Sequence, residues 1–239
     1  MNTIKFDKQN VRMVAHRGLS GLETENTNAA FVAAGNRSYY GIETDIYRSA
    51  DGHFVVNHDG DLVRIGGERI CAEAVSADVF QSIVLFDKDG TKNRRDLRPS
   101  TLENYISICK KYEKQCILEL KSAFSDEEIE KIIAIITDMG YIDGVTFISF
   151  NYDNLLKVRR VRPEQSAQYL FGGLSDEIFD MLVRDRIDAD MHFPALSNEV
   201  VNKLHTAGLK VNCWTVDSAA DGERLARMGV DFITSNILE

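Results

Sequence analysis

The chain has 239 residues, of which 44% are hydrophobic and 27% are charged. This balance is typical of a globular protein with a core, and it excludes collagen, coiled coil and extensive disorder. The 28 Lys and Arg residues against 37 Asp and Glu residues give a formal net charge of −9. That charge argues against general nucleic-acid binding, because phosphate backbones require clustered cations.

No apolar run in the sequence reaches the ~18 residues of a membrane span. The first ten residues also lack the apolar core of a secretory signal peptide. We therefore expect a cytoplasmic protein without a transmembrane segment.

Strand and helix signals alternate from the start of the chain. Residues 11–16 are predicted as a short buried strand, and residues 25–34 as a helix with Asn26 or Thr27 as its N-cap. A second strand is predicted at residues 40–47.

Two capping boxes mark later helices, because Ser100-x-x-Glu103 and Ser125-x-x-Glu128 each precede an amphipathic run. Six further strands are predicted, at residues 116–120, 145–149, 166–170, 187–190, 209–214 and 230–234. Eight strands interleaved with helices, in a chain of this length, predict an α/β fold of the (β/α)8 TIM-barrel type.

Residues 48–99 interrupt this alternation. They contain a predicted hairpin strand at residues 53–57, a short helix near residues 76–85 and a polar loop that runs to Pro99. We interpret this stretch as a small insertion after the second strand, and residues 1–239 as a single TIM-barrel domain.

Carboxylates gather where such a barrel carries its chemistry, at the C-terminal ends of the strands. Glu43 and Asp45 are two residues apart on a strand, so both side chains project to the same face. Glu119 points inward from the next barrel strand. Three carboxylates in one interior favour a hard divalent cation, Mg²⁺ or Ca²⁺, over zinc. The alternative is a solvated edge whose acids pair with Arg or Lys.

Two histidines, His16 and His58, each close an apolar run and are expected at strand ends that face the barrel mouth. Imidazole titrates near neutral pH, so such a pair is suited to general acid and base catalysis. The alternative for each is a hydrogen-bonded structural histidine.

Arg17 and Lys121 are the cations placed to hold a phosphate oxygen, although ion pairs with the acids are an equally open reading. Trp214, the only tryptophan, is either part of the core or a wall against the apolar part of a ligand. The basic run Lys92–Arg98 is interpreted as a solvated loop, with capture of an anionic headgroup as its alternative.

Several motifs resemble those of the glycerophosphodiester phosphodiesterase family, and they follow one another in order along essentially the whole chain. They are His16-Arg17-Gly18, Glu25-Asn26-Thr27, Glu43-x-Asp45, His58-Asp59, Leu118-Glu119-Leu120-Lys121, Ser149-Phe150, Trp214-Thr215-Val216 and Gly229 to Asn236.

The resemblance implies hydrolysis of glycerophosphodiesters, such as glycerophosphocholine or glycerophosphoethanolamine, to an alcohol and glycerol 3-phosphate. It implies a barrel with a small insertion after the second strand and a divalent cation, Mg²⁺ or Ca²⁺, with Mn²⁺ as a further choice. By similarity to the related phosphoinositide phospholipases, the glycerol 2-hydroxyl is expected to attack phosphorus and form a cyclic phosphate. The site residues that it implies are Glu43, Asp45 and Glu119 for the metal, His16 and His58 for acid and base catalysis, and Arg17 and Lys121 for the phosphate.

Two departures from the family pattern are Thr24, where proline is common, and Asp217, where asparagine is frequent. Neither is expected to supply a catalytic atom, so we expect them to affect only loop shape and the rim of the pocket. The expected partner is a small-molecule substrate, and homo-oligomerisation is left open.

Two alternative functions are weighed. A lysophospholipase D would need an apolar groove, for which Phe80, Leu85 and Phe86 of the insertion are the available residues. A non-catalytic barrel that binds phosphorylated ligands would require an incomplete set of catalytic groups, and the set is complete in the sequence.

Overall fold

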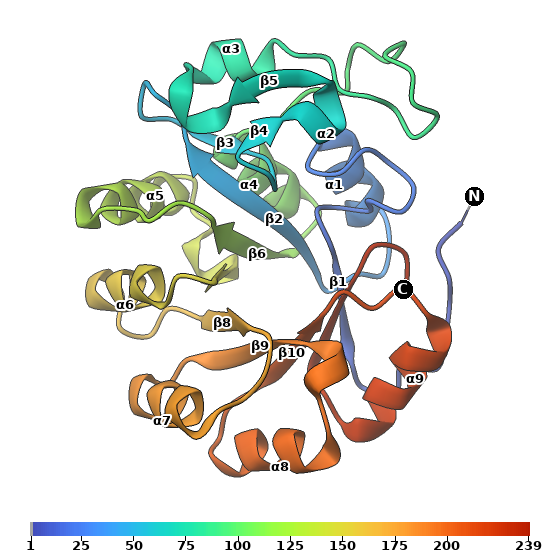
Figure 1. Ribbon diagram of the computed structural model, residues 1–239, viewed down its shortest axis with the longest axis vertical. Helices are drawn as coiled ribbons and strands as arrows, with labels where there is room; N and C mark the ends of the chain where they lie inside the picture. Colours follow the sequence, from blue (N-terminus) through green and yellow to red (C-terminus); the bar gives the residue numbers. More distant parts are fainter. Residues whose placement is uncertain (1) are drawn as a thin grey trace.

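The computed structural model describes residues 2–239, and within them the chain forms a closed barrel of eight parallel strands (Figure 1). Strand β1 pairs with β2 on one side and with β11 on the other, which closes the ring. The predicted TIM barrel is therefore confirmed. The barrel strands are β1 (Arg12–Ala15), β2 (Gly41–Arg48), β6 (Gln115–Leu120), β7 (Val145–Ser149), β8 (Ala167–Phe171), β9 (Asp188–His192), β10 (Val211–Trp214) and β11 (Phe232–Ser235).

Helices cover the outside of the barrel, and the main hydrophobic core lies between them and the strands (Figure 1). They are α1 (Asn28–Gly35), α4 (Leu102–Lys111), α5 (Asp126–Asp138), α6 (Tyr152–Val161), α7 (Asp176–Asp185), α8 (Asn198–Thr206) and α9 (Ala219–Met228), with short 3-10 turns η2 (Ile142–Gly144) and η3 (Phe193–Ala195). Among residues 2–239, none of the helices combines the length and the apolar character needed to cross a membrane.

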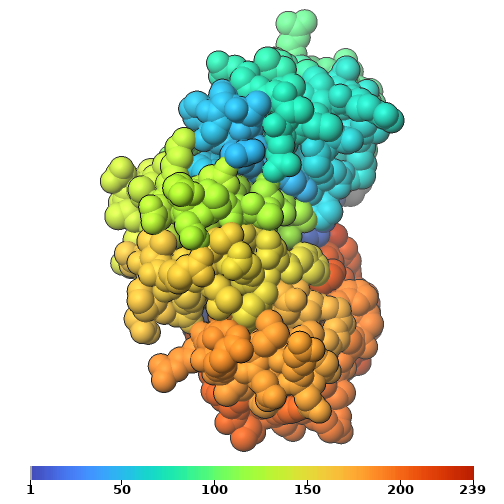
Figure 2. All heavy atoms as spheres, turned by 60° about the vertical axis from the view of Figure 1, so that its left-hand side comes forward, coloured from blue at the N-terminus to red at the C-terminus, as the bar shows by residue number. Residues whose placement is uncertain are grey.

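The segment between β2 and α4 forms the predicted insertion, which lies at the upper end of the molecule in Figures 1 and 2. Its core is a separate small cluster around Leu62, Phe80 and Leu85. Strand β3 pairs antiparallel with the end of β2, so the insertion extends the barrel sheet beyond the barrel mouth. Its elements are β3 (Phe54–Val56), β4 (Asp61–Leu62), α2 (Val63–Gly66), β5 (Glu68–Cys71), η1 (Ala72–Ala74) and α3 (Ala77–Gln81).

One of the two predicted capping boxes is confirmed and the other is wrong. Ser125 caps α5 with both reciprocal hydrogen bonds. Helix α4 instead begins one residue later than predicted, with Thr101 as its N-cap. The carbonyl of Ser100 accepts from Val56 N of β3, and its hydroxyl donates to Asn28 Oδ1, so tertiary partners draw Ser100 away from the cap.

Candidate active site

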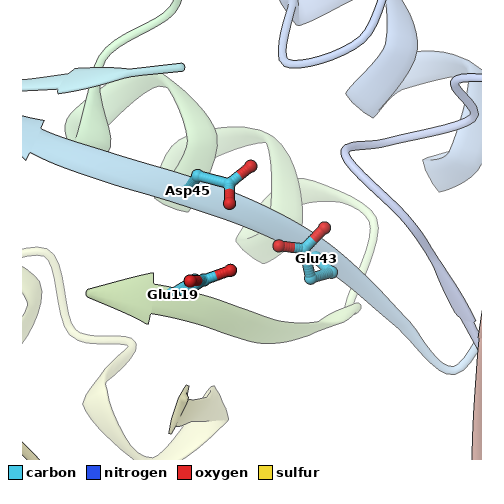
Figure 3. A group of neighbouring side chains, drawn as sticks. All are labelled: Glu43, Asp45 and Glu119. Carbon is cyan, nitrogen blue, oxygen red and sulfur yellow. The ribbon is translucent and has the colours of Figure 1, made fainter. Parts of the chain in front are cut away.

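The three predicted acids meet inside the barrel mouth (Figure 3). Glu43 and Asp45 lie on the inner face of β2, and Asp45 is the register partner of Glu119 on β6. Each residue offers a carboxylate oxygen within 4.8 Å of the other two. Their side chains are almost fully buried, so water does little to screen the repulsion between them.

This repulsion is visible in the pKa values. Burial, followed by the charge of Asp45, raises the pKa of Glu43 well above its usual range and that of Glu119 to about 8. Burial alone would also raise the pKa of Asp45, but Lys121 and Arg17 overcome it and hold that pKa below its ordinary value. The cluster is therefore short of positive charge, as expected for a cation site.

Arg17 and Lys121 lie against the acids. Arg17 Nε is 3.8 Å from Asp45 Oδ2, while Lys121 Nζ is 3.0 Å from Glu119 Oε1 and 3.5 Å from Asp45 Oδ1. The ion-pair reading of these two residues therefore holds in the structure. Arg17 also lines the cavity beside the acids.

A tight turn after β1 places Arg17. Arg17 and Gly18 have φ of 54° and 75°, and a Cβ on Gly18 would lie 2.7 Å from Ala30, so only glycine fits there. The turn aims the backbone N–H of Arg17 at Glu43 Oε2, at 2.7 Å. The motif His16-Arg17-Gly18 thus places the side chains of His16 and Arg17 and also fixes the carboxylate of Glu43.

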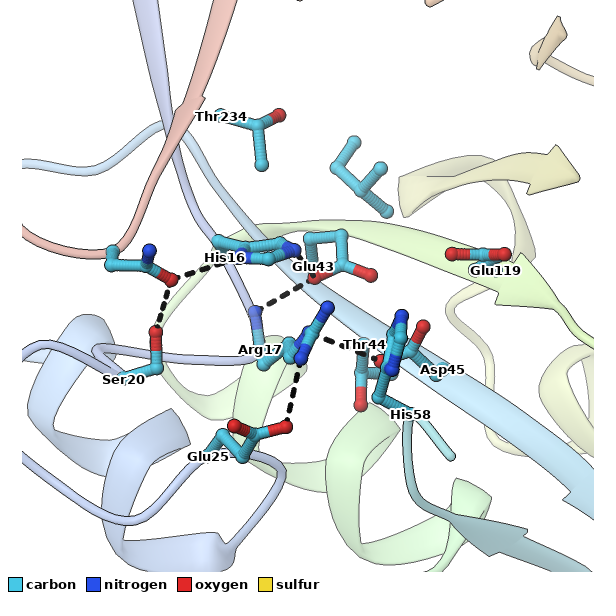
Figure 4. A network of polar contacts seen from close by, with 12 residues as sticks. His16, Arg17, Ser20, Glu25, Glu43, Thr44, Asp45, His58, Glu119 and Thr234 are labelled. Atoms are coloured by element: carbon cyan, nitrogen blue, oxygen red, sulfur yellow. Dashed lines mark hydrogen bonds and ion pairs between the residues drawn. The ribbon is translucent and has the colours of Figure 1, made fainter. Parts of the chain in front are cut away.

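His16 is oriented by a chain of hydrogen bonds from the loop after β11, the barrel strand next to β1. Figure 4 shows the polar contacts around His16. Asn236 Nδ2 donates to Asp217 Oδ2 at 2.6 Å, which leaves Asn236 Oδ1 as the acceptor for His16 Nδ1, at 2.8 Å. Nε2 of His16 therefore carries the lone pair and lies 4.0 Å from Glu43 Oε2. Burial, followed by the charge of Arg17, lowers the pKa of His16 to about 4.

His58 enters the site from the insertion, just after β3. Its Nδ1 is 2.8 Å from Asp59 Oδ1, and Arg64 Nε donates to the other oxygen of Asp59. Arg64 also binds both carboxylate oxygens of Glu25, which in turn holds Arg17. Burial lowers the pKa of His58, although Asp45 opposes it.

The sequence left open whether Asn26 or Thr27 is the N-cap of the first helix, and the structure gives the two residues different roles. Thr27 is the N-cap of α1 and accepts from Ala30 N. Asn26 is buried with φ of 57°, donates to Asp45 Oδ2 at 2.9 Å and accepts from Thr44. Asn26 is therefore a support for the acid cluster, which sequence reasoning missed.

Trp214 lies on the far side of the same opening. It packs edge-on against Phe150 at a centroid distance of 5.6 Å and is half-buried, with Phe150 itself 51% exposed. The opening forms a cavity of about 110 Å³. Its lining residues are His16, Arg17, Glu43, His58, Glu119, Ile148, Phe150, Leu170, Asp190, Trp214, Thr215 and Thr234.

The basic run and the apolar residues of the insertion do not contribute to this cavity. Arg94 pairs with Glu23 and Asp96, which agrees with the solvated-loop reading of Lys92–Arg98. Phe80 and Leu85 are fully buried in the insertion's own cluster, so their use as an exposed apolar groove was wrong. The physical reason is that a small lobe needs its few large side chains for its own core.

Sequence reasoning assigned no role to Arg64 or Asp190, and only a minor one to Asp217. Asp217 was expected only to shape the rim, but it is the carboxylate that orients Asn236. Asp59 and Asn236 both stand within recognised motifs, and this was the signal that the sequence offered for them. Nothing in the local pattern around Arg64 or Asp190 distinguishes them from ordinary charged residues of a loop or a strand.

Known proteins resemble the chain over its whole length. The sequence profile described as the glycerophosphoryl diester phosphodiesterase family matches residues 16–238. A glycerophosphodiester phosphodiesterase of Caldanaerobacter subterraneus subsp. tengcongensis is 30% identical over 230 residues, covering 94% of this chain and 93% of the relative.

Two solved structures share the fold. A glycerophosphodiester phosphodiesterase from Parabacteroides distasonis is 28% identical, with a TM-score of 0.78 and coverage of 95% of this chain and 93% of that one. A phosphodiesterase of Oleispira antarctica, solved with its product sn-glycerol 3-phosphate, has a TM-score of 0.84 at 22% identity and covers 98% of this chain and 96% of its own. The resemblance inferred from the sequence motifs and the predicted enzyme class are confirmed. With a matching profile over nearly all of its length, this chain belongs to the glycerophosphoryl diester phosphodiesterase family.

Proposed function

We propose that this protein hydrolyses glycerophosphodiesters, such as glycerophosphocholine or glycerophosphoethanolamine, to an alcohol and glycerol 3-phosphate. One observation carries the proposal: His16, His58, Arg17, Glu43 and Glu119 line a single cavity. Asp45 completes the acid cluster behind it, and Lys121 pairs with Asp45 and Glu119. The product bound to the Oleispira phosphodiesterase is the product expected here.

We infer that Glu43, Asp45 and Glu119 hold a divalent cation. Asp45 Oδ1 is buried, and beyond the ion pair with Lys121 Nζ at 3.5 Å it has no hydrogen-bond partner among residues 2–239, so it is open to a further ligand. Three carboxylates suit the hard cations Mg²⁺ and Ca²⁺, and Mn²⁺ accepts the same ligands. When bound, the cation supplies Lewis-acid chemistry, lowering the pKa of a hydroxyl and stabilising charge on phosphoryl oxygens.

Arg17 and Lys121 suit the phosphate. Arginine offers a planar fork of donors and lysine a compact charge, and both side chains here are held in place by the acids. A phosphodiester anion entering the cavity would exchange part of this pairing for contacts with its own oxygens. Trp214 would form the wall against the carbon skeleton of the substrate.

The hydrogen bonds of the two histidines suggest which is the base. Both have Nδ1 bound to an acceptor, so both can act through Nε2. The acceptor for His16 is the neutral amide of Asn236, whereas that for His58 is the carboxylate of Asp59, which stabilises an imidazolium. We therefore assign His16 as the general base and His58 as the general acid.

In this assignment the glycerol 2-hydroxyl attacks phosphorus while His16 Nε2 accepts its proton. The P–O bond to the departing alcohol breaks, and His58 Nε2 gives its proton to that oxygen. Water then opens the cyclic phosphate as the roles reverse, with His58 accepting a proton from water and His16 returning one to the 2-hydroxyl. Both histidines end in their starting states.

The test is release of glycerol 3-phosphate from glycerophosphocholine and glycerophosphoethanolamine, in EDTA and with Mg²⁺, Ca²⁺ or Mn²⁺. We expect release that requires a cation and falls about 10²- to 10⁴-fold in His16→Ala and in His58→Ala. His205→Ala, which removes an exposed histidine paired with Asp231, is the matched control and should keep full activity.

Release of glycerol 3-phosphate that is unaffected by EDTA would contradict the proposed role of the cation. No release from either substrate with any cation would contradict the proposed reaction. Turnover of an acylated glycerophosphodiester alone would favour the lysophospholipase D alternative instead.

A further inference from the structure

The cavity at the barrel mouth has two unlike sides. The catalytic groups occupy the side formed by β1, β2, β6 and the insertion. The opposite side, formed by β7 to β10, has apolar walls and one carboxyl group to which the proposed chemistry gives no role. Its residues are Ile148, Phe150, Leu170, Asp190 and Trp214, with Thr215 directly after β10.

Asp190 is the unexplained residue on that side. It is 1% exposed and sits on the inner face of β9, between Leu170 of β8 and Asn212 of β10. Asn212 Nδ2 donates to Asp190 Oδ2 at 3.2 Å. The other oxygen, Oδ1, is buried and has no hydrogen-bond partner in the part of the chain that the structure describes.

The surrounding residues fix the position of Asp190 but leave its Oδ1 without a hydrogen-bond donor. Trp214 Nε1 donates to the backbone carbonyl of Asp190 at 3.3 Å, and Asn212 is itself anchored to Gln168. A buried acceptor without a donor destabilises the fold, so an unpaired one that lines a cavity points to a donor brought by a ligand.

The cavity selects the kind of donor. Ile148 and Leu170 suit carbon atoms, while Asp190 offers a single acceptor oxygen among them. A short polyol with a hydroxyl at its end matches this combination. The variable alcohol of the substrate has to leave toward solvent, whereas the glycerol moiety is common to all substrates and fits a small recess.

We propose that Asp190 is a specificity-determining residue whose Oδ1 accepts a hydrogen bond from the terminal hydroxyl of the glycerol moiety, the one farthest from the phosphate. This inference rests on the proposed function, and it explains why the substrate would have to contain glycerol. Asp190 takes no part in bond breaking and positions the substrate through that hydroxyl.

The test compares two substrates that differ by one hydroxyl. Glycerophosphoethanolamine carries the terminal hydroxyl, and the phosphoethanolamine diester of propane-1,2-diol lacks it while keeping the attacking 2-hydroxyl. Wild-type protein should prefer the glycerol substrate by about 10- to 100-fold in kcat/KM, because the analogue leaves a buried carboxyl oxygen without its hydrogen-bond partner. Asp190→Ala should bring that preference below ~3-fold by losing activity on the glycerol substrate alone.

Matched variants separate specificity from folding. Asp188→Asn alters the other carboxyl of β9, which does not line the cavity, and should leave the preference unchanged. If Asp190→Ala does not fold, Asp190→Asn keeps the volume and a weaker acceptor, and should lower the preference several-fold. Calorimetry with glycerol 3-phosphate and propane-1,2-diol 1-phosphate should show the same ranking in affinity.

Equal losses on both substrates would make Asp190 a structural residue and overturn the inference. So would a loss seen with the ethanolamine headgroup but not with choline, because Asp190 would then accept from the N–H groups of the primary ammonium, which choline lacks. If wild type hydrolysed neither substrate the proposed function would fail, and the calorimetric ranking would still decide whether the hydroxyl is recognised.

Discussion

At the scale of single residues, the acids of the site are arranged at the expense of stability. Burial beside Asp45 raises the pKa of both Glu43 and Glu119, so the fold holds these groups in an unfavourable environment. Such an arrangement is stable in the presence of a cation and strained without one. Stability and cation binding are therefore expected to be linked.

We predict that saturating divalent cation stabilises the wild-type protein by about 3 kcal/mol, a rise in Tm of roughly 5–10 °C, and that Glu43→Gln abolishes this rise. The substitution keeps an acceptor for Arg17 N while removing one repelling charge, so the cation-free Tm should stay equal or increase. Thermal unfolding with EDTA or cation measures both. Glu130→Gln, an exposed substitution on α5, should behave as wild type; an unchanged cation response in Glu43→Gln would contradict the metal site.

A second prediction concerns the chain of hydrogen bonds behind His16. Asp217→Ala should allow the amide of Asn236 to rotate, so that His16 loses its fixed tautomer and kcat falls about 10- to 100-fold. The pH profile of kcat should change in shape, while Tm should fall by no more than a few degrees. Steady-state kinetics across pH measure this, with Asp221→Asn on α9 as the partly exposed control; a loss confined to KM would contradict it.

At the scale of elements, the insertion completes the site that the barrel begins. It supplies His58 from the end of β3, and its short helix α2 supplies Arg64. Arg64 joins Glu25, which holds Arg17, to Asp59, which holds His58. The loops that carry the two sides of the catalytic machinery are thus tied together by one guanidinium.

We predict that Arg64→Ala lowers kcat/KM about tenfold, because two loops lose their common support. Arg64 is 46% exposed, so the free energy of unfolding should change by less than ~1 kcal/mol. Arg64→Lys keeps the charge without the fork that reaches both acids, and it should recover only a small part of the activity. Kinetics together with urea unfolding measure the difference. A stability loss that accounts for the whole activity loss would contradict a positioning role.

At the scale of the whole molecule, the barrel joins distant parts of the chain, and its two ends meet. Ile4 forms a bridge with Leu238, and Glu239 receives hydrogen bonds from Thr3 and Ser38 and an ion pair from Lys5. Although burial alone would raise the pKa of Glu239, these partners lower it to about 2. The carboxylate of Glu239 thus clamps the N-terminal segment to the barrel.

The pH dependence of this clamp has a definite sign. Since the pKa is lowered in the folded state, the stabilisation is complete above the ordinary glutamate value of 4.5 and is lost as pH falls toward 2. Glu239→Gln should cost about 1–3 kcal/mol of unfolding free energy at pH 7 and almost nothing near pH 2. Urea unfolding of both proteins between pH 2 and 7 measures this, with the partly exposed Glu223→Gln as control. A cost independent of pH would contradict the clamp.

Much of the architecture follows from the sequence because its signals are local. Apolar runs and turn residues predicted the eight barrel strands to within a few residues, and the E-x-D spacing on β2 placed Glu43 and Asp45 on one face. The motifs likewise indicated the histidines and cations that the structure brings together. Their individual roles stay predictions until the substitutions above are measured.

Contacts between residues far apart in the chain were decided only by the tertiary structure. The hydrogen bond from His16 Nδ1 to Asn236 Oδ1 joins opposite ends of the sequence, and the start of α4 shifted because Ser100 found partners in β3 and α1. Asp190 looks like any strand residue until Leu170 and Asn212 are placed beside it. The local sequence pattern determines which face of a strand a side chain occupies. The burial of that side chain, the tautomer of a histidine and the lack of a hydrogen-bond partner depend on the residues that the closed barrel places next to that face.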